Sequence, residues 1–223
     1  MKFVKTDYRT LELNPMTLIG DEWMLVTAGD DQTGWNTMTA SWGHLGYIWQ
    51  RPTAICYIRP QRYTRQFADR EPLYSLSFFP EGYKKQLSYL GSHSGRDEDK
   101  VKTVGLTPVF GDGYTYFEEA KLVLVCRKLY QAPLLEQGFV DPAVVESCYP
   151  KKDFHDLYVG EIVEVLTKAE ERGRADGAGC LRRPILFCLA RKEWGEKRRW
   201  TRNSADAQKS ILILRTIYRW RVP

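Results

Sequence analysis

The order in which predicted strands follow one another is the feature that most constrains the fold of this chain. Segments rich in β-branched and aromatic residues are separated by tight turns or by short helices. Six strands are predicted at residues 22–30, 36–42, 53–59, 73–79, 121–130 and 157–166, with a further hairpin at 108–118. A doubly wound parallel sheet needs a crossover helix after nearly every strand, and few are present. The pattern therefore predicts a mainly β protein with antiparallel pairing in a barrel-like sheet.

The helices predicted between these strands are short. They cover residues 64–70, 83–90 and 97–104, and the last begins with three acidic residues that suit the positive end of a helix. Residues 133–150 are predicted to form an irregular, partly helical excursion between the last two strands. We therefore expect helices that are insertions in a β fold rather than a layer of their own.

The formal charge of +5 is unevenly distributed along the chain. Residues 1–168 carry 19 Lys and Arg against 22 Asp and Glu, a formal charge of −3. Residues 169–223 carry 14 Lys and Arg against 6 Asp and Glu, a formal charge of +8, and the strand pattern stops there. The sequence thus predicts a folded domain over residues 1–168 and a basic C-terminal extension over residues 169–223.

Three interpretations of the basic extension stay open. A disordered or partly folded arm could bind nucleic acid or an acidic membrane surface. An added structural segment could pack on the barrel. The third interpretation, which we favour, is that the segment is not native, because 11 of its 14 basic residues are Arg and no periodicity accompanies them. Arg has many codons and accumulates in translated frames that selection has not shaped.

Several classes of protein are disfavoured by motifs that the sequence lacks. The five cysteines and three histidines show no spacing typical of a metal site. A G-x-S-x-G motif, a P-loop and a G-x-G-x-x-G before a helix are also absent, which disfavours hydrolases and Rossmann dehydrogenases. We find no apolar run of membrane-spanning length and no secretory signal, so we expect reduced thiols and a cytoplasmic location. Cys56 and Cys126 lie in apolar runs and should be buried.

Three segments combine short hydrogen-bond donors with basic residues, an indole or the start of a helix. They are residues 36–42 (NTMTASW), 59–64 (RPQRYT) and 91–97 (GSHSGRD), the last followed by Lys100. Hydroxyls, guanidinium groups and free backbone N–H groups are what a protein uses to hold a phosphate dianion. Each segment also has an ordinary explanation, because the hydroxyls could cap helices and the arginines could be solvated charges. Together, in an acidic domain, they favour a bound anion without saying which one.

Residues 36–64 (NTMTASWGHLGYIWQRPTAICYIRPQRYT) resemble the opening signature of the flavin reductase-like, FMN-binding split-barrel family. In that family a T-A-S motif is followed by a loop, a proline, an apolar strand and a basic turn that ends in Thr. Later motifs match in the family's order at residues 74–79 (YSLSFF), 94–100 (SGRDEDK) and 155–165 (HDLYVGEIVEV). The resemblance spans residues 13–168. It implies a six-stranded antiparallel split β-barrel of Greek-key type that forms a homodimer with FMN near the subunit interface.

The resemblance also assigns roles to residues. Those that would line the isoalloxazine ring and the ribityl chain are Asn36, Thr39, Ala40, Ser41 and Trp42. Those that would grip the phosphate are Arg59, Arg62, Tyr63 and Thr64. Those that would close the site, either from the loop over the flavin or from the partner subunit, are Ser94, Arg96 and Lys100. His155 is the expected catalytic residue, lying near the nicotinamide and orienting the donor rather than acting as a base.

The activity that the resemblance implies is that of an NAD(P)H-dependent oxidoreductase of flavin-reductase type. Hydride would pass from NAD(P)H to N5 of FMN, and the electrons would go on to a flavin or another small-molecule acceptor. Trp42 stands where many members have a small hydroxyl residue, and Tyr47 and Trp49 make the following loop, residues 43–51, bulkier than usual. Efficient reduction of free flavins is therefore less expected. Two alternatives remain, a non-catalytic FMN-binding electron-relay module and a protein that binds nucleic acid through the basic extension.

Overall fold

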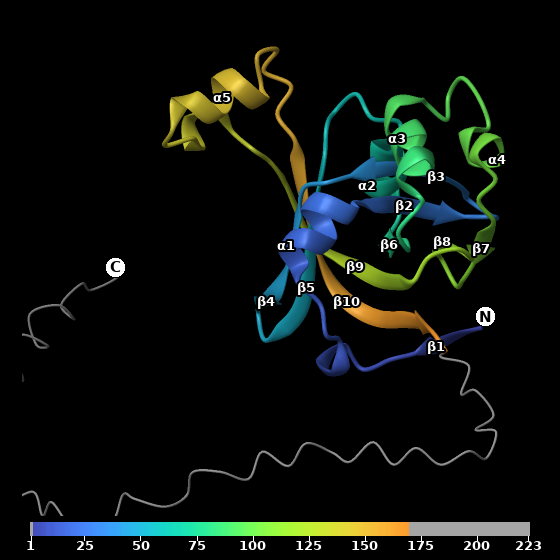
Figure 1. Cartoon of the computed structure of the whole chain (residues 1–223). Helices are drawn as coiled ribbons and strands as arrows, with labels where there is room; N and C mark the ends of the chain where they lie inside the picture. The colour runs from blue at the N-terminus through green and yellow to red at the C-terminus, as the bar shows by residue number, and fades with distance from the viewer. Residues whose placement is uncertain (1, 170–223) are drawn as a thin grey trace, which may run out of the picture. The chain divides into compact units, whose positions relative to one another are not determined.

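The computed structural model describes residues 2–169, and Figure 1 shows their strands and helices. The elements in chain order are β1 Phe3–Lys5, η1 Tyr8–Thr10, α1 Pro15–Thr17, η2 Leu18–Glu22, β2 Met24–Asp30, β3 Gly34–Ala40, β4 Gly43–Ile48, β5 Arg51–Ile58, α2 Thr64–Arg70, β6 Leu73–Phe78, α3 Lys84–Ser92, α4 Lys100–Val104, β7 Pro108–Phe110, β8 Thr115–Phe117, β9 Leu122–Pro133, η3 Glu136–Gly138, α5 Pro142–Cys148 and β10 Asp156–Lys168. Apart from Ala169, the predicted basic extension lies outside the described residues, so its three interpretations stay predictions.

One antiparallel sheet of eight strands organises the described part of the chain. Its hydrogen-bonded order is β3-β2-β6-β9-β10-β5-β4, and β1 pairs with the end of β10. The hairpin of β7 and β8 forms a separate small sheet. The prediction of a mainly β fold with antiparallel pairing and short inserted helices is confirmed. The main sheet has two more strands than the six that the resemblance implied.

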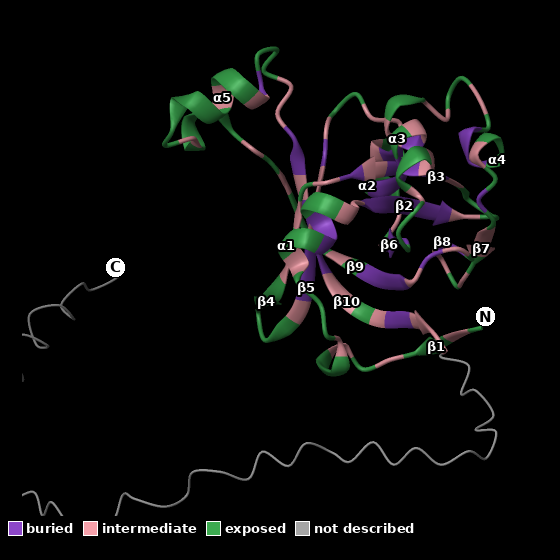
Figure 2. Cartoon of the chain, in the orientation of Figure 1, coloured by how far each residue is buried: buried purple, intermediate pink, exposed green. Residues whose placement is uncertain are grey.

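The central strands bury side chains on both faces. Val26 of β2 and Leu124 of β9 belong to one core cluster, while their neighbours Leu25 and Val123 belong to a second one. The second cluster includes Leu87 of α3, so this helix covers one face of the sheet. Successive residues of a strand point to opposite faces, so burial on both sides explains why β9 reads as a continuous apolar run. Figure 2 shows this concentration of buried residues in β2 and β9.

The short helices lie close to where they were predicted. Helix α2 has the predicted bounds, and α3 is shifted by one or two residues. Helix α4 begins at Lys100 because the Asp99 side chain accepts a hydrogen bond from the backbone N–H of Lys102 and so caps the helix. The predicted excursion contains η3 and α5, and α5 is held away from the strands and largely exposed (Figures 1 and 2).

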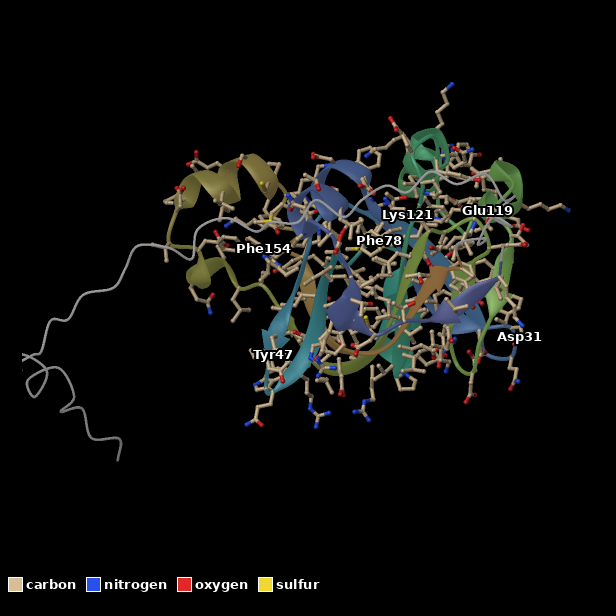
Figure 3. The ribbon with its side chains drawn as sticks, turned by 60° about the horizontal axis from the view of Figure 1, so that its bottom comes forward. Asp31, Tyr47, Phe78, Glu119, Lys121 and Phe154 are labelled. Atoms are coloured by element: carbon tan, nitrogen blue, oxygen red, sulfur yellow. The ribbon has the colours of Figure 1, made fainter. Side chains whose placement is uncertain are left out.

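The expectation that residues 43–51 form a loop is wrong. Gly43–Ile48 is strand β4, which pairs with β5 from Gly43 opposite Cys56 to Ile48 opposite Arg51. Trp49 and Gln50 form the turn with φ of 53° and 58°, the backbone conformation of a tight two-residue hairpin. Figure 3 labels Tyr47 in this hairpin and Phe78 among the strands of the core. Since most of β4 is exposed, its sequence has no apolar alternation that would have predicted a strand.

Two further predictions about the described residues can be assessed. Cys56 and Cys126 are buried in the core, as their apolar surroundings predicted. Strand β1 and the helical turns α1 and η2 were not predicted, because each is short and carries few buried residues. Among residues 2–169 no helix combines the length and the apolar character that crossing a bilayer requires.

We predict that Gly160→Ala destabilises the fold. Gly160 lies at a register shift between β10 and β9, and a Cβ atom there would overlap the hydroxyl of Tyr74 and come within 2.8 Å of the Cβ of Cys126. Tyr74 is 2% exposed and donates a hydrogen bond to the carbonyl of Ala54, so it has little room to move. Overpacking of this kind costs about 1–3 kcal/mol of unfolding free energy, which urea denaturation will measure.

The matched control is Gly46→Ala in β4, where a Cβ atom has no neighbour within 4 Å. Equal unfolding free energies for the two variants would show that the close approach at Gly160 carries no strain.

Candidate functional site

Two adjoining cavities contain all thirteen predicted site residues. The first, which we call the basic cavity, has a volume of about 350 Å³ and is lined by Asn36, Arg59, Arg62, Tyr63, Thr64, Ser94, Arg96 and Lys100, among others. The second, the His155 cavity, has a volume of about 230 Å³ and is lined by Thr39, Ala40, Ser41, Trp42, Arg59, Arg62 and His155, among others. Met38, Arg59 and Arg62 line both cavities, so the two form one continuous site.

The fold brings these residues together from four places in the chain. The end of β3 supplies the hydroxyl-rich segment, and the turn between β5 and α2 supplies the two arginines. The loop between α3 and α4 forms a wall of the basic cavity, and the residue just before β10 contributes His155. Strand pairing fixes three of these four segments, because β3 and β5 lead into the site and β10 begins beside it.

A buried hydrogen bond fixes the floor of the basic cavity. The side-chain amide of Asn36 donates to the hydroxyl of Thr64 over 2.8 Å, and both residues are more than 90% buried. A Cβ atom at Gly95 would overlap the amide oxygen of Asn36, so only glycine lets the α3–α4 loop approach this closely. Thr64 does not cap α2 through its side chain, because Tyr63 occupies the N-cap position and Thr64 bonds to Asn36. The simple capping explanation of Thr64 is therefore wrong.

Three cationic groups of the basic cavity are not neutralised by carboxylates. Within residues 2–169 no carboxylate oxygen lies within 4.0 Å of the charged nitrogens of Arg62, Arg96 or Lys100. Asp97 also lines the cavity without pairing with them. Arg62 donates to the carbonyl of Gly91, and the guanidinium of Arg96 lies 4.6 Å from the centre of the Tyr63 ring. Excess positive charge around a concave surface attracts an anion.

Burial and neighbouring positive charge disfavour the protonated form of Lys100. The side chain is 4% exposed, and its ammonium group donates to the carbonyls of Leu90 at 2.9 Å and His93 at 3.0 Å. Burial, and then the nearby charge of Arg62, lowers the pKa of Lys100 to about 8. Burial, and then the charge of Arg59, also lowers the pKa of Arg62. A bound anion would relieve this repulsion and so stabilise the charged forms of both groups.

Arg59 differs from the other basic residues of the site because it has an acidic partner. Its guanidinium donates to the carboxylate of Asp153 and, over 2.9 Å, to the carbonyl of Cys148, and it lies 5.2 Å from the centre of the Tyr149 ring. Gln61 donates to the same carboxylate over 2.8 Å. These bonds lower the pKa of Asp153 to about 2. Arg59 therefore ties the turn after β5 to the segment that precedes β10.

His155 is a neutral, buried imidazole at the end of the His155 cavity. It is 8% exposed, its Nδ1 atom lies 2.9 Å from the hydroxyl of Tyr149, and its ring centre lies 4.9 Å from that of Trp42. Burial, and then the charge of Arg59, lowers the pKa of His155 to about 4. At neutral pH the ring therefore carries no charge and can accept or donate a hydrogen bond without acting as a cation.

Some residues of the site were missed by the sequence analysis. Tyr57 lines the His155 cavity, Tyr149 bonds to His155 and Asp153 bonds to Arg59, and all three lie outside the predicted segments. Met38, Gln61, His93 and Asp97 also line the cavities and lie within the predicted segments, where no individual role was given to them. Gly95 likewise lies in the predicted segment 91–97, as a glycine between Ser94 and Arg96. Tyr149 lies in the irregular excursion and Asp153 between the excursion and β10, where no periodicity shows which way a side chain points.

We predict that His155 titrates well below an ordinary histidine. Its pKa of about 4 means that the unfolded chain takes up a proton near pH 6.5 while the folded protein does not. This contribution to stability is present above pH 6.5 and is lost as the pH falls from 6.5 towards 4. NMR titration of the imidazole protons will give the midpoint directly, and replacement of Tyr149 by Phe identifies the resonance. A midpoint near 6.5 would contradict the burial and charge that the structure shows.

Comparison with known proteins matches this chain to one family. Residues 16–191 match the model of the flavin reductase like domain, a match that runs past the predicted boundary at Lys168. No curated protein matches the chain. Three solved structures share the fold: an FMN-binding domain of a flavin reductases-like enzyme from Shewanella baltica, flavoredoxin of Desulfovibrio vulgaris, and an FMN-binding protein from Thermus thermophilus with bound p-hydroxybenzaldehyde.

The similarity to these structures extends over most of the folded domain. Their sequence identities are 14%, 23% and 25%, and their TM-scores are 0.53, 0.52 and 0.52. The alignments cover 74%, 74% and 76% of this chain, and 77%, 77% and 85% of the respective neighbours. The sheet is therefore the split barrel of these neighbours. Because the family model matches well over half of the sequence, this chain belongs to the flavin reductase-like family.

Proposed function

We propose that this protein binds FMN in the two adjoining cavities and acts as an NAD(P)H-dependent oxidoreductase of flavin-reductase type. The observation that carries the proposal is the pairing of two cavities. The basic cavity has three cations with no carboxylate partner among residues 2–169, and the His155 cavity is lined by hydroxyl and aromatic residues. FMN has the matching chemistry, a phosphate dianion joined through a ribityl chain to a flat ring. Family membership and the similarity to FMN-binding proteins support the same assignment.

The residues of the basic cavity fit the phosphate and the ribityl chain. Arg62, Arg96 and Lys100 supply charge-assisted donors, and Thr64 supplies a hydroxyl already positioned by Asn36. Ser94 accepts a hydrogen bond from the backbone N–H of Arg96, which keeps its oxygen in the wall of the cavity. Arg59 adds positive charge at the junction of the two cavities while Asp153 fixes its position.

The residues of the His155 cavity fit a flat ring and its polar edge. Thr39, Ala40 and Ser41 bring hydroxyl and backbone groups to one side of it, and Trp42, which is 42% exposed, supplies an indole. The flavin, when bound, accepts a hydride from the nicotinamide donor and passes electrons to an acceptor. His155 remains neutral and, with its ring fixed by Tyr149, orients the donor without transferring a proton.

We also propose that the protein works in the cytoplasm as a homodimer with small-molecule donors and acceptors as its partners. Support for a dimer comes from exposed apolar side chains on the β4–β5 hairpin and on β9, namely Tyr47, Ile48, Trp49 and Tyr130. Trp49 and Tyr130 lie next to each other, with ring centres 6.4 Å apart. Exposed clusters of large apolar side chains commonly mark protein interfaces.

We predict that the purified protein is yellow or takes up added FMN, with absorbance at about 450 nm. Removing a charged hydrogen bond costs about 1.5–3 kcal/mol, so Arg62→Ala should weaken FMN retention by at least about tenfold. Arg59→Ala and Thr64→Ala should also weaken FMN retention. Equilibrium dialysis measures the retention, and circular dichroism confirms that each variant is folded.

The control for these variants is Arg9→Ala, which removes an exposed arginine that lines neither cavity. A colourless protein that takes up no FMN would reject the proposal. Unchanged FMN affinity in all three site variants would show that the basic cavity is not part of the FMN site.

We predict that NADH or NADPH bleaches the flavin absorbance when oxygen is excluded. The result separates the proposed oxidoreductase from the non-catalytic relay module, which would bind FMN and stay yellow. His155→Ala should slow the bleaching by raising the KM for the donor, because an orienting residue acts on donor binding. Stopped-flow absorbance measures both parameters. An unchanged KM would exclude His155 from the donor site.

A further inference from the structure

We propose that a third, apolar pocket beside the His155 cavity binds a neutral aromatic molecule of one or two rings. The pocket has a volume of about 430 Å³. Its walls come from the α1–η2 segment, the start of β4, the end of β5 and the excursion after β9, with the lining residues Pro15, Met16, Ile19, Gly20, Ser41, Trp42, Gly43, His44, Tyr57, Leu134, Phe139, Val144, Cys148 and Tyr149. Two of its lining residues, Ser41 and Trp42, were assigned to the flavin by the sequence analysis, whereas its other lining residues were given no ligand. The existence of the pocket is independent of FMN, whereas its role as a ligand site of the enzyme rests on the proposed function.

The chemistry of the lining selects a neutral ligand. None of the residues that line the pocket is Asp, Glu, Lys or Arg, whereas four cationic residues line the neighbouring basic cavity. Placing a charged group among apolar side chains without a partner costs several kcal/mol. The volume lies in the range of about 300–1,000 Å³ that is usual for small-molecule sites with mainly apolar walls. A phosphate or carboxylate ligand is therefore directed to the basic cavity and excluded from this pocket.

Aromatic rings form much of the wall and favour a flat ligand. Trp42 and Tyr149 meet edge to face with ring centres 6.4 Å apart, and Phe139 lies 5.6 Å from Tyr149. Aromatic pairs of this kind are stabilised by both contact area and ring electrostatics, which another ring can extend. On the polar side, the hydroxyl of Tyr57 and Nδ1 of His44 lie 3.3 Å apart. They can hydrogen-bond to a single hydroxyl or carbonyl group on the ligand.

The pocket is continuous with the candidate site. Ser41, Trp42 and Tyr57 line both this pocket and the His155 cavity, so an occupant would contact the same side chains as a ring bound beside His155. The back wall includes Ile19 and Tyr149, which are 5% and 3% exposed and therefore belong to the packed body of the domain. A recess with such buried walls is filled better by a small molecule than by the flat surface of a second protein copy.

The outer wall of the pocket comes from the excursion that carries α5. Figure 3 labels Phe154, which follows this segment just before β10, and shows α5 extending away from the strands. Val144 of α5 lines the pocket and is 40% exposed, so a larger side chain there can occupy the space without displacing the core. On the opposite wall, a Cβ atom at Gly20 would have no neighbour within 4 Å. These two positions allow the pocket to be filled from either side.

The test uses the full-length protein and isothermal titration calorimetry with 2-naphthol, a neutral two-ring probe, and 2-naphthoate, its anionic counterpart. We expect 2-naphthol to bind and 2-naphthoate to bind at least about tenfold more weakly. Val144→Trp and Gly20→Phe should each weaken 2-naphthol binding by at least about tenfold. The matched controls are Val163→Trp on the exposed surface of β10 and Gly46→Phe on β4, neither of which lines the pocket.

Each outcome decides the proposal. Loss of 2-naphthol binding in both pocket variants, with unchanged binding in both controls, supports it. It is overturned if 2-naphthol does not bind, if the anion binds equally well, or if neither pocket variant changes binding. It is also overturned if the pocket variants instead convert a dimer to a monomer in sedimentation, because a second copy would then cover the pocket. FMN retention is measured in the same samples, so failure of the FMN site is distinguished from failure of this pocket.

Discussion

The pairing of β10 with strands on both of its edges is the constraint on which the rest of the structure depends. β10 pairs with β9 from Asp156 to Thr167, while its other edge pairs first with β5 and then with β1. Because a backbone N–H or C=O buried without a partner is costly, a strand with two filled edges cannot slide in register. The start of β10 consequently fixes His155, and the β5 ladder fixes the turn that carries Arg59. Gly160 permits this arrangement, since Tyr74 crosses the strand where a Cβ atom would otherwise lie.

The site combines one cation that has a carboxylate partner, Arg59, with cations that have none among residues 2–169, such as Arg62 and Lys100. Asp153 holds Arg59 in place, and this ion pair joins the turn after β5 to the segment just before β10. Burial and then the charge of Arg59 lower the pKa of Arg62, and burial and then the charge of Arg62 lower that of Lys100, so the folded domain contains repulsion that an anion would relieve. This is a physical reason for the domain to bind a phosphate even though its formal charge, −3 over residues 1–168, is negative. The local arrangement of charge, not the total, determines which ligand the surface attracts.

The strand pattern predicted most of the fold because its signals are local. Buried strands such as β6 and β9 are rich in β-branched and aromatic residues, and α2 ends just before Pro72. Exposed β4 gave no such signal, since its pairing with β5 stabilises it rather than its own side chains. The sequence likewise pointed to the hydroxyl and basic residues of the site through short motifs. Asp153 was missed because its partner, Arg59, lies far away along the chain. Tyr149 was missed because it lies in an irregular segment without periodicity, although its partner, His155, is only six residues away.

The sequence by itself determined the fold class, the family and the types of residue that gather at the site, because periodicity and short motifs are properties of neighbouring residues. Only the tertiary structure decided that Arg59 is paired while Arg62 is not, and that His155 is a buried neutral ring. It also showed that an apolar pocket opens beside Trp42. Burial, charge pairing and cavity walls depend on segments far apart in the chain. No local pattern encodes them, since each arises only when the sheet brings those segments into contact.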